Sequence, residues 1–215
     1  MYVPKQFEET RLDVLHQLVR SHPLGTFVVL GDAELLANHM PILIDPRQGP
    51  YGTLRMHVAR SNPVWQQLGK PVEALAVFQG PESYITPSWY PSKHTDGKVV
   101  PTWNYAVVHA YGRPRAMEDP AWILEHVTQL TAEHEAVQGL PWKLSDAPEN
   151  YRDQMISRIV GIEMPLSRIQ GKWKVSQNRP LADQLGVVAG LESQATERSR
   201  AMAQLVMTRA RSSSA

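Results

Sequence analysis

The sequence predicts an α+β, mainly β fold, in which a β-barrel carries a few peripheral helices. Short apolar stretches of strand length alternate with turn signals along most of the chain, and many of the 17 prolines stand at their edges. Segments with helix patterns and capping residues are few and lie between or after these strands. Many short strands with a few helices are typical of a barrel, although their number does not choose the kind of barrel.

Six extended stretches account for the strands. Each is apolar or alternating and is bounded by glycine, proline or acidic turn residues, and the longest shows Val107, His109 and Tyr111 on one face. A polar, proline-containing loop is expected at 86–98. The predicted strands cover residues 26–30, 35–44, 51–58, 74–78 continuing at 84–85, 99–117 and 161–173.

Helices are predicted where a periodic apolar face follows a capping residue. Asn62 and Asp119 are each followed by proline at the first helical position, and Asp146 is placed to cap a third helix. Gly186 and Gly190 are weak points of the last helix. The predicted helices cover 10–21, 62–68, 119–137, 146–160 and 178–208, and the residues from Arg211 onward are expected to fray.

Composition describes an ordinary globular chain. It has 215 residues, 42% of them hydrophobic and 20% charged, with a net charge of +1 and no cysteine. The absence of cysteine excludes disulfides, thiolate metal sites and cysteine nucleophiles, and it fits a reducing compartment. We find neither a secretory signal pattern nor an apolar run long enough to span a membrane, so we expect a cytoplasmic protein without a membrane partner. Dedicated DNA-binding domains are usually much more basic.

Several common motifs are absent. The sequence contains no dinucleotide-binding glycine motif, no P-loop, no nucleophile elbow, no His-Glu-x-x-His and no convincing helix-turn-helix. His126 and His134 lie eight residues apart on a predicted helix, which we interpret as two half-exposed histidines rather than as a metal site. We therefore predict no metal, and the sequence assigns no catalytic residue.

Four clusters combine hydrogen-bond donors with aromatic residues at strand ends. In the first, 55–63, Arg60 and Ser61 precede the Asn62 cap and would suit a phosphate, whereas the simpler interpretation is a cap beside a solvated arginine. The second, 78–90, is either a recognition loop or a hydrophobic cluster under a loop. The third, 100–113, alternates Trp103 and Tyr105 with Asn104. The fourth, 171–179, places Lys172 and Lys174 around a tryptophan. This arrangement would suit a planar anionic ligand, whereas the simpler interpretation is a turn at the end of a sheet with solvated lysines.

Across these residues the sequence resembles the PaiB-type FMN-binding family of negative transcriptional regulators. The resemblance covers the chain up to about Leu191, so we expect an FMN-binding split-barrel domain at 1–191 and a helical tail at 192–215. The matching stretches are MYVPK with Phe7, HPLG at 22–25, ANHMP at 37–41, HVARSNP at 57–63, FQGP at 78–81, YITPSWY at 84–90, VPTWNY at 100–105, GIE at 161–163 and KWKVSQNRP at 172–180.

The resemblance implies an FMN-binding split β-barrel, related to the pyridoxamine-phosphate-oxidase and flavin-reductase group, with FMN at the interface of a homodimer. The FMN phosphate would then meet Arg60, Ser61 and Asn62, and the isoalloxazine ring would lie along His39 and the strand end at His57 and Val58. Further contacts could come from either subunit, at Gln79, Trp103, Asn104, Lys172, Lys174, Gln177 and Asn178.

The sequence leaves three functions open. The first is a flavin-binding sensor or regulator without turnover, the second is an FMN-dependent oxidoreductase acting on a small molecule, and the third is a DNA-binding repressor that needs flavin only structurally. DNA as a partner comes from the family resemblance alone, and the small net charge disfavours the third function unless a basic stripe forms across a dimer.

Overall fold

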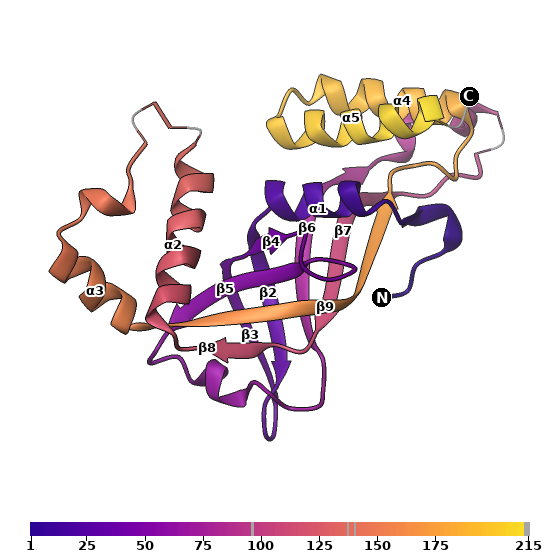
Figure 1. Cartoon of the computed structure of the whole chain (residues 1–215). Helices are drawn as coiled ribbons and strands as arrows, with labels where there is room; N and C mark the ends of the chain where they lie inside the picture. The colour runs from indigo at the N-terminus through magenta and orange to yellow at the C-terminus, as the bar shows by residue number, and fades with distance from the viewer. Residues whose placement is uncertain (96, 137, 140, 213–215) are drawn as a thin grey trace. The chain divides into compact units, whose positions relative to one another are not determined.

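The computed structural model describes residues 1–95, 97–136, 138–139 and 141–212. Figure 1 shows its elements along the chain. The strands are β1 (Glu8–Glu9), β2 (Leu24–Leu30), β3 (Leu35–Pro41), β4 (Leu43–Asp45), β5 (Thr53–Ala59), β6 (Ala74–Ile85), β7 (Thr102–Gly112), β8 (Arg115–Met117) and β9 (Ile159–Lys174). The α-helices are α1 (Leu12–Ser21), α2 (Pro120–Glu135), α3 (Glu149–Ser157), α4 (Leu181–Ser193) and α5 (Glu197–Ser212), and five short 3-10 helices occur in the connections described.

The chain forms two compact units. The first comprises residues 1–18, 79–108 and 170–215, and the second comprises residues 19–78 and 109–169. The strand order is β3-β2-β6-β7-β9-β5-β4, with β1 and β8 also paired to β9. Of these strands, β6, β7 and β9 contribute residues to both units.

The second unit is built from antiparallel pairs around an apolar interior. Strand β2 pairs with β3 from Leu24–Pro41 to Leu30–Leu35, and β5 pairs with β9 from Thr53–Pro165 to Ala59–Ile159. Alternate residues of these strands face inward, as the period of two requires. The interior includes Phe27, Leu54, Met56, Ala76, Phe78, Ile162 and Met164, all at most 1% exposed.

The outer face of the β2–β3 hairpin is apolar and open to solvent. Leu24 is 68% exposed, Leu30 44% and Leu35 70%. Leu30 and Leu35 stand opposite each other in the register, so their side chains form one cross-strand pair. Isolated exposed leucines need no explanation, but this pair and the neighbouring Val28–Ala37 pair form one apolar patch, which indicates a contact surface; Thr26 and His39 separate the patch from Leu24.

In the first unit, the helical hairpin of α4 and α5 holds the 86–95 loop. The helices lie side by side (yellow and orange in Figure 1). A Cβ atom at Gly190 would stand 2.2 Å from the Trp89 ring, and one at Gly186 would stand 2.1 Å from the Trp89 carbonyl oxygen. The buried Asp183 carboxylate accepts hydrogen bonds from the backbone N–H and hydroxyl of Ser92.

The loop at 86–90 is therefore the hydrophobic cluster rather than an exposed recognition loop. Tyr90 is 1% exposed, its ring lies 4.6 Å from the Arg179 guanidinium, and Trp89 is half-buried against α4. The glycines that the sequence marks as weak points of a helix form the slot for Trp89. Because glycine has no Cβ, Trp89 can approach the helix backbone closely, and this contact outweighs the lower helix propensity of glycine.

Most predicted elements are present, and several differ. The stretch predicted at 35–44 is two strands, β3 and β4, the stretch at 99–117 is also two, β7 and β8, and β1 was not predicted. The predicted helix at 178–208 is two helices, which separate where Ala195 adopts a left-handed backbone (φ 55°). The segments at 74–78 and 84–85 form one strand, β6. Asp146 does not cap α3: its carboxylate accepts the Lys143 N–H and so closes a 3-10 turn, while α3 begins after Pro148.

Candidate functional site

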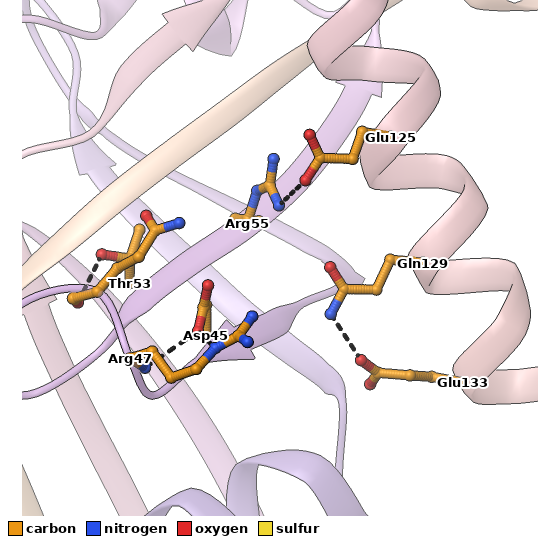
Figure 2. A network of polar contacts seen from close by, with 8 residues as sticks. Asp45, Arg47, Thr53, Arg55, Glu125, Gln129 and Glu133 are labelled. Carbon is orange, nitrogen blue, oxygen red and sulfur yellow. Dashed lines mark hydrogen bonds and ion pairs between the residues drawn. The ribbon is translucent and has the colours of Figure 1, made fainter.

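In the second unit, β5 presents two polar residues to helix α2. Arg55 and His57 share one face of β5 because they are two residues apart. The Arg55 guanidinium donates to Glu125 at 3.0 Å (Figure 2) and lies 4.6 Å from the Trp122 ring centre. His57 Nδ1 lies 3.1 Å from His126 Nε2, and the His126 ring stacks on Trp122.

This cluster, made of Arg55, His57, Trp122, Glu125 and His126, holds two neutral imidazoles. Burial lowers the pKa of His57, and burial together with His57 and Arg55 lowers the pKa of His126 to about 3. Nδ1 of His126 and Nε of Arg55 are buried without a hydrogen-bond partner among the described residues. A second positive charge would therefore be costly here, which keeps the pair uncharged near neutral pH.

The interpretation of His126 from sequence as half-exposed is wrong. It is completely buried, while His134 on the same helix is exposed. The β5–α2 pairing was missed because His57 and His126 are 69 residues apart, and only the i, i+4 spacing of Trp122 and His126 hints at a shared face.

The predicted phosphate segment follows β5. Asn62 caps as expected, since its side chain accepts the Val64 N–H, and its amide also donates to Asn38. The helix that it begins is only a 3-10 turn, Pro63–Gln67, which is too short to offer a phosphate the dipole of an α-helix. The Ser61 hydroxyl is on an exposed residue and has no partner among the described residues.

Arg60 is engaged within the protein. It donates to Ser157 O at 3.0 Å, to Ile159 O at 3.3 Å and to Glu118 at 2.7 Å. These contacts use three of the five N–H donors of a guanidinium, and the side chain is 39% exposed. The simpler interpretation, in which Arg60 is only solvated, is therefore wrong. The assignment of Arg60 to a phosphate stays a prediction.

The other two predicted residues of this unit differ in exposure. His39 is exposed on the outer face of β3, opposite Thr26 in the register. Val58 is 6% exposed and faces the interior, so a ligand could meet it only through its backbone. The structure thus presents His39, Arg60 and Ser61 at the surface of the second unit.

The first unit contains a surface of aromatic rings and lysines, formed by Tyr84, Trp103, Tyr105, Lys172 and Lys174. Trp103 is 52% exposed and meets Tyr84 edge to face at 6.0 Å. The Lys172 ammonium lies 5.3 Å from the Tyr105 ring. Lys174 donates to Trp103 O and to Thr102 Oγ1, and burial, with the neighbouring Lys172 and Arg179 charges, lowers its pKa. We call these five residues the aromatic–lysine surface.

Beneath this surface the segment after β9 is tightly held. Asn104 is buried and donates to Ser176 Oγ at 2.8 Å, while its Oδ1 has no donor among the described residues. Ser176 has a left-handed backbone (φ 65°), an uncommon conformation for serine. Gln177 accepts from Val175 N and donates to Trp173 O, which fixes the turn. Asn178 and Gln79 are exposed, and Gln79 donates to Glu82.

Each unit, taken by itself, offers residues whose chemistry fits one part of FMN. The aromatic–lysine surface combines flat rings with two cations, as a planar anionic ring system requires. The exposed Ser61 hydroxyl and the remaining Arg60 donors are polar groups that a phosphate can use. No described group of three histidine, aspartate or glutamate side chains is arranged to hold a metal ion.

Comparison with known proteins identifies the family. The profile described as "Putative FMN-binding domain" matches residues 1–168, and the chain therefore belongs to this FMN-binding family, of the PaiB type. A protein of Aspergillus fumigatus is 34% identical over 97% of both chains. The "Protease synthase and sporulation protein PAI 2" of Bacillus subtilis is 29% identical over 96% of both chains.

Solved structures with the same fold are distant in sequence. The flavocytochrome Anf3 of Azotobacter vinelandii superposes with a TM-score of 0.61 at 9% identity, over 80% of this chain and 72% of the other. A FAD- and heme-binding protein of Mycobacterium smegmatis gives 0.58 at 11% identity, over 78% and 73%. The predicted fold, a mainly β split barrel with peripheral helices, is confirmed. No helix in the described ranges is long and apolar enough to cross a membrane.

Proposed function

We propose that this protein binds FMN as a homodimer and acts as a flavin-dependent sensor or negative transcriptional regulator. The observation that carries the proposal is the aromatic–lysine surface, found in a chain of the FMN-binding family. Its rings would face the isoalloxazine, and its lysines would offset negative charge on the bound flavin. When bound, FMN supplies a redox-active ring whose state a sensor can report.

The phosphate is assigned to the 60–62 segment of one subunit, and the aromatic–lysine surface to its partner. Support comes from exposure: Arg60, Ser61 and the outer face of β3 with His39 are open in the single chain. The apolar leucines of the β2–β3 hairpin supply the surface that a second copy would cover. A cytoplasmic location, and DNA as a partner, are parts of the same proposal.

Ligand titration tests the flavin assignment. Apo-protein is titrated with FMN, FAD and riboflavin, and bound flavin is followed by its absorbance and fluorescence. Riboflavin lacks the phosphate that the 60–62 segment is proposed to bind. FMN should therefore bind more tightly than riboflavin. Equal affinities for the two would contradict the phosphate assignment, and no binding of any flavin would contradict the function.

Turnover and DNA binding separate the possible roles. A sensor or regulator should show no sustained NAD(P)H oxidation in the FMN-loaded state, whereas steady turnover with a small-molecule acceptor would favour the oxidoreductase. Retention of genomic DNA fragments by FMN-loaded dimer, lost at high salt, would support the regulator over a sensor that acts through another partner.

A further inference from the structure

A cavity in the second unit lies between helices α2 and α3 and the connecting residues 142–145. It has a volume of about 440 Å³, within the size range of small-molecule sites. Its apolar wall includes Leu124, Ala132, Leu144 and the ring of Trp142, which is 45% exposed. Neither the predicted flavin residues nor the exposed leucines of β2 and β3 line it.

The wall formed by 142–145 is anchored rather than loose. Glu135 Oε2 accepts the Trp142 N–H at 2.9 Å, and Asp146 Oδ2 accepts the Lys143 N–H at 2.9 Å. Both bonds fix the backbone from which the Trp142 and Lys143 side chains extend beside the cavity. A site whose walls are already placed costs a ligand less ordering on binding.

The charged groups that line the cavity are both cations. They are Lys143 and Arg152, and no carboxylate lines it. Arg152 is partly neutralised by Glu149 at 3.4 Å and Asp153 at 3.3 Å. Lys143 forms no ion pair within the described chain, so its charge is available. Threonine and serine hydroxyls add neutral hydrogen-bond partners.

We propose that this cavity binds a small aromatic carboxylate. Its ring would lie against Trp142 and the leucines, and its carboxylate would meet Lys143 and Arg152. The apolar wall selects for a ring, since burying apolar area drives binding. The carboxylates nearest the cavity are already engaged, Glu135 and Asp146 by backbone N–H groups and Glu149 and Asp153 by Arg152, so the Lys143 ammonium is the charge that favours an anion. The site is separate from the proposed flavin site, so the two can be tested independently.

Calorimetric titration of the full-length protein with naphthoate tests the proposal, with naphthamide as the uncharged counterpart. Naphthoate should bind, and naphthamide should bind at least about tenfold more weakly, the change expected for losing a charge-assisted hydrogen bond. Lys143→Met should weaken naphthoate by a similar factor and leave naphthamide unchanged. Lys93→Met removes an exposed lysine of the 91–94 turn and should change neither affinity.

Filling the cavity is the second arm. Ala132→Trp places a large ring in it and should abolish naphthoate binding, and Thr128→Trp serves if the first variant does not fold by circular dichroism. Saturating FMN should leave naphthoate binding unchanged. The proposal is overturned if the wild type does not bind naphthoate, if naphthamide binds equally, if both filled variants bind normally, or if FMN displaces the probe.

Discussion

Arg60 has a structural role in the protein and a proposed role in phosphate binding, and its substitution can separate the two. Its bonds to Ser157 O and Ile159 O tie the end of α3 to β9, while its remaining donors are those assigned to the FMN phosphate. Arg60→Ala should weaken FMN by about 1.5–3 kcal/mol, the range for a lost charge-assisted hydrogen bond, without weakening riboflavin. Fluorescence titration with both ligands checks this. If both affinities fall equally, or neither falls, Arg60 is structural only.

The buried histidine pair predicts a dependence of stability on pH. The folded-state pKa of His126 is about 3, below the ordinary value of about 6.5. The stability that neutral His126 contributes is therefore complete above pH ~6.5 and is lost as pH falls through that value toward about 3. The free energy of unfolding, measured with urea between pH ~7 and ~5, should decrease with acid.

Two variants on α2 identify the source of that slope. His126→Phe keeps a ring beside Trp122 but removes the titrating group, so the slope should become smaller although the protein is less stable overall. His134→Gln, at an exposed position of the same helix, should leave the slope unchanged. The range above pH ~5 is chosen because carboxylates titrate below it. An unchanged slope in His126→Phe would refute the assignment.

At single residues, the sequence predicted what local chemistry decides. The caps at Asn62 and Asp119 are local. Each residue lies directly before a proline, and its side chain accepts the backbone N–H of the residue two positions later. Asp146 was equally suited, yet its carboxylate bonds Lys143 N instead, and this competition between neighbouring turns has no sequence signal. The His57–His126 contact depends on strand and helix meeting in space, which spacing along one chain cannot show.

At the scale of elements, the slot for Trp89 on α4 gives an unusual prediction for glycine substitution. Gly190→Ala would ordinarily stabilise a helix by up to about 1 kcal/mol. Here the new Cβ would stand 2.2 Å from the Trp89 ring, so we expect destabilisation by about 1–3 kcal/mol from overpacking. Gly139→Ala, where no atom lies within 4 Å, is the control and should change stability little. Urea unfolding of both variants decides the sign, and a stabilised Gly190→Ala would contradict the slot.

The same slot explains why the last helix was predicted imperfectly. From sequence, glycines in a helical pattern are interpreted as weak points of the helix. The residue that needs the space beside them, Trp89, lies about a hundred residues earlier, so the sequence does not show their packing role. The actual break, at Ala195, has neither glycine nor proline to signal it. The strands were predicted more accurately because alternation and flanking turns are local properties.

At the scale of the whole molecule, strand pattern and motif resemblance predicted the fold class and family, whereas the dimer needs a surface that only coordinates reveal. Tyr90 and Trp173, aromatic residues of the second and fourth clusters, are buried at 1% and 9% exposure and so add nothing to an exposed surface. The exposed apolar side chains on which we base the proposed dimer include the leucines of β2 and β3. The domain boundary at Leu191 stays a prediction, and Leu191 lies within α4.

A charge on the leucine face should dissociate the proposed dimer. Leu35 is 70% exposed and faces Leu30, so Leu35→Glu would place carboxylates in an apolar interface without unfolding the hairpin. Sedimentation equilibrium at micromolar concentration should give twice the 24.2 kDa chain mass for the wild type and a mass closer to one chain for the variant. Tyr151→Glu, at a 54% exposed position on α3, should remain dimeric. A wild-type monomer that binds FMN fully would refute the dimer.

We expect Trp103 to take part in both association and flavin binding. It is 52% exposed, meets Tyr84 edge to face and has its carbonyl held by Lys174, so its ring is positioned but uncovered. If FMN lies between this ring and the 60–62 segment of the partner, Trp103→Ala should weaken both FMN binding and the dimer, each by about 1 kcal/mol or more. Tyr151→Ala, an equally exposed aromatic position on α3, should change neither. Loss of flavin affinity from an intact dimer would keep Trp103 in the site but remove it from the interface, because a residue that bridges ligand and partner must affect both equilibria.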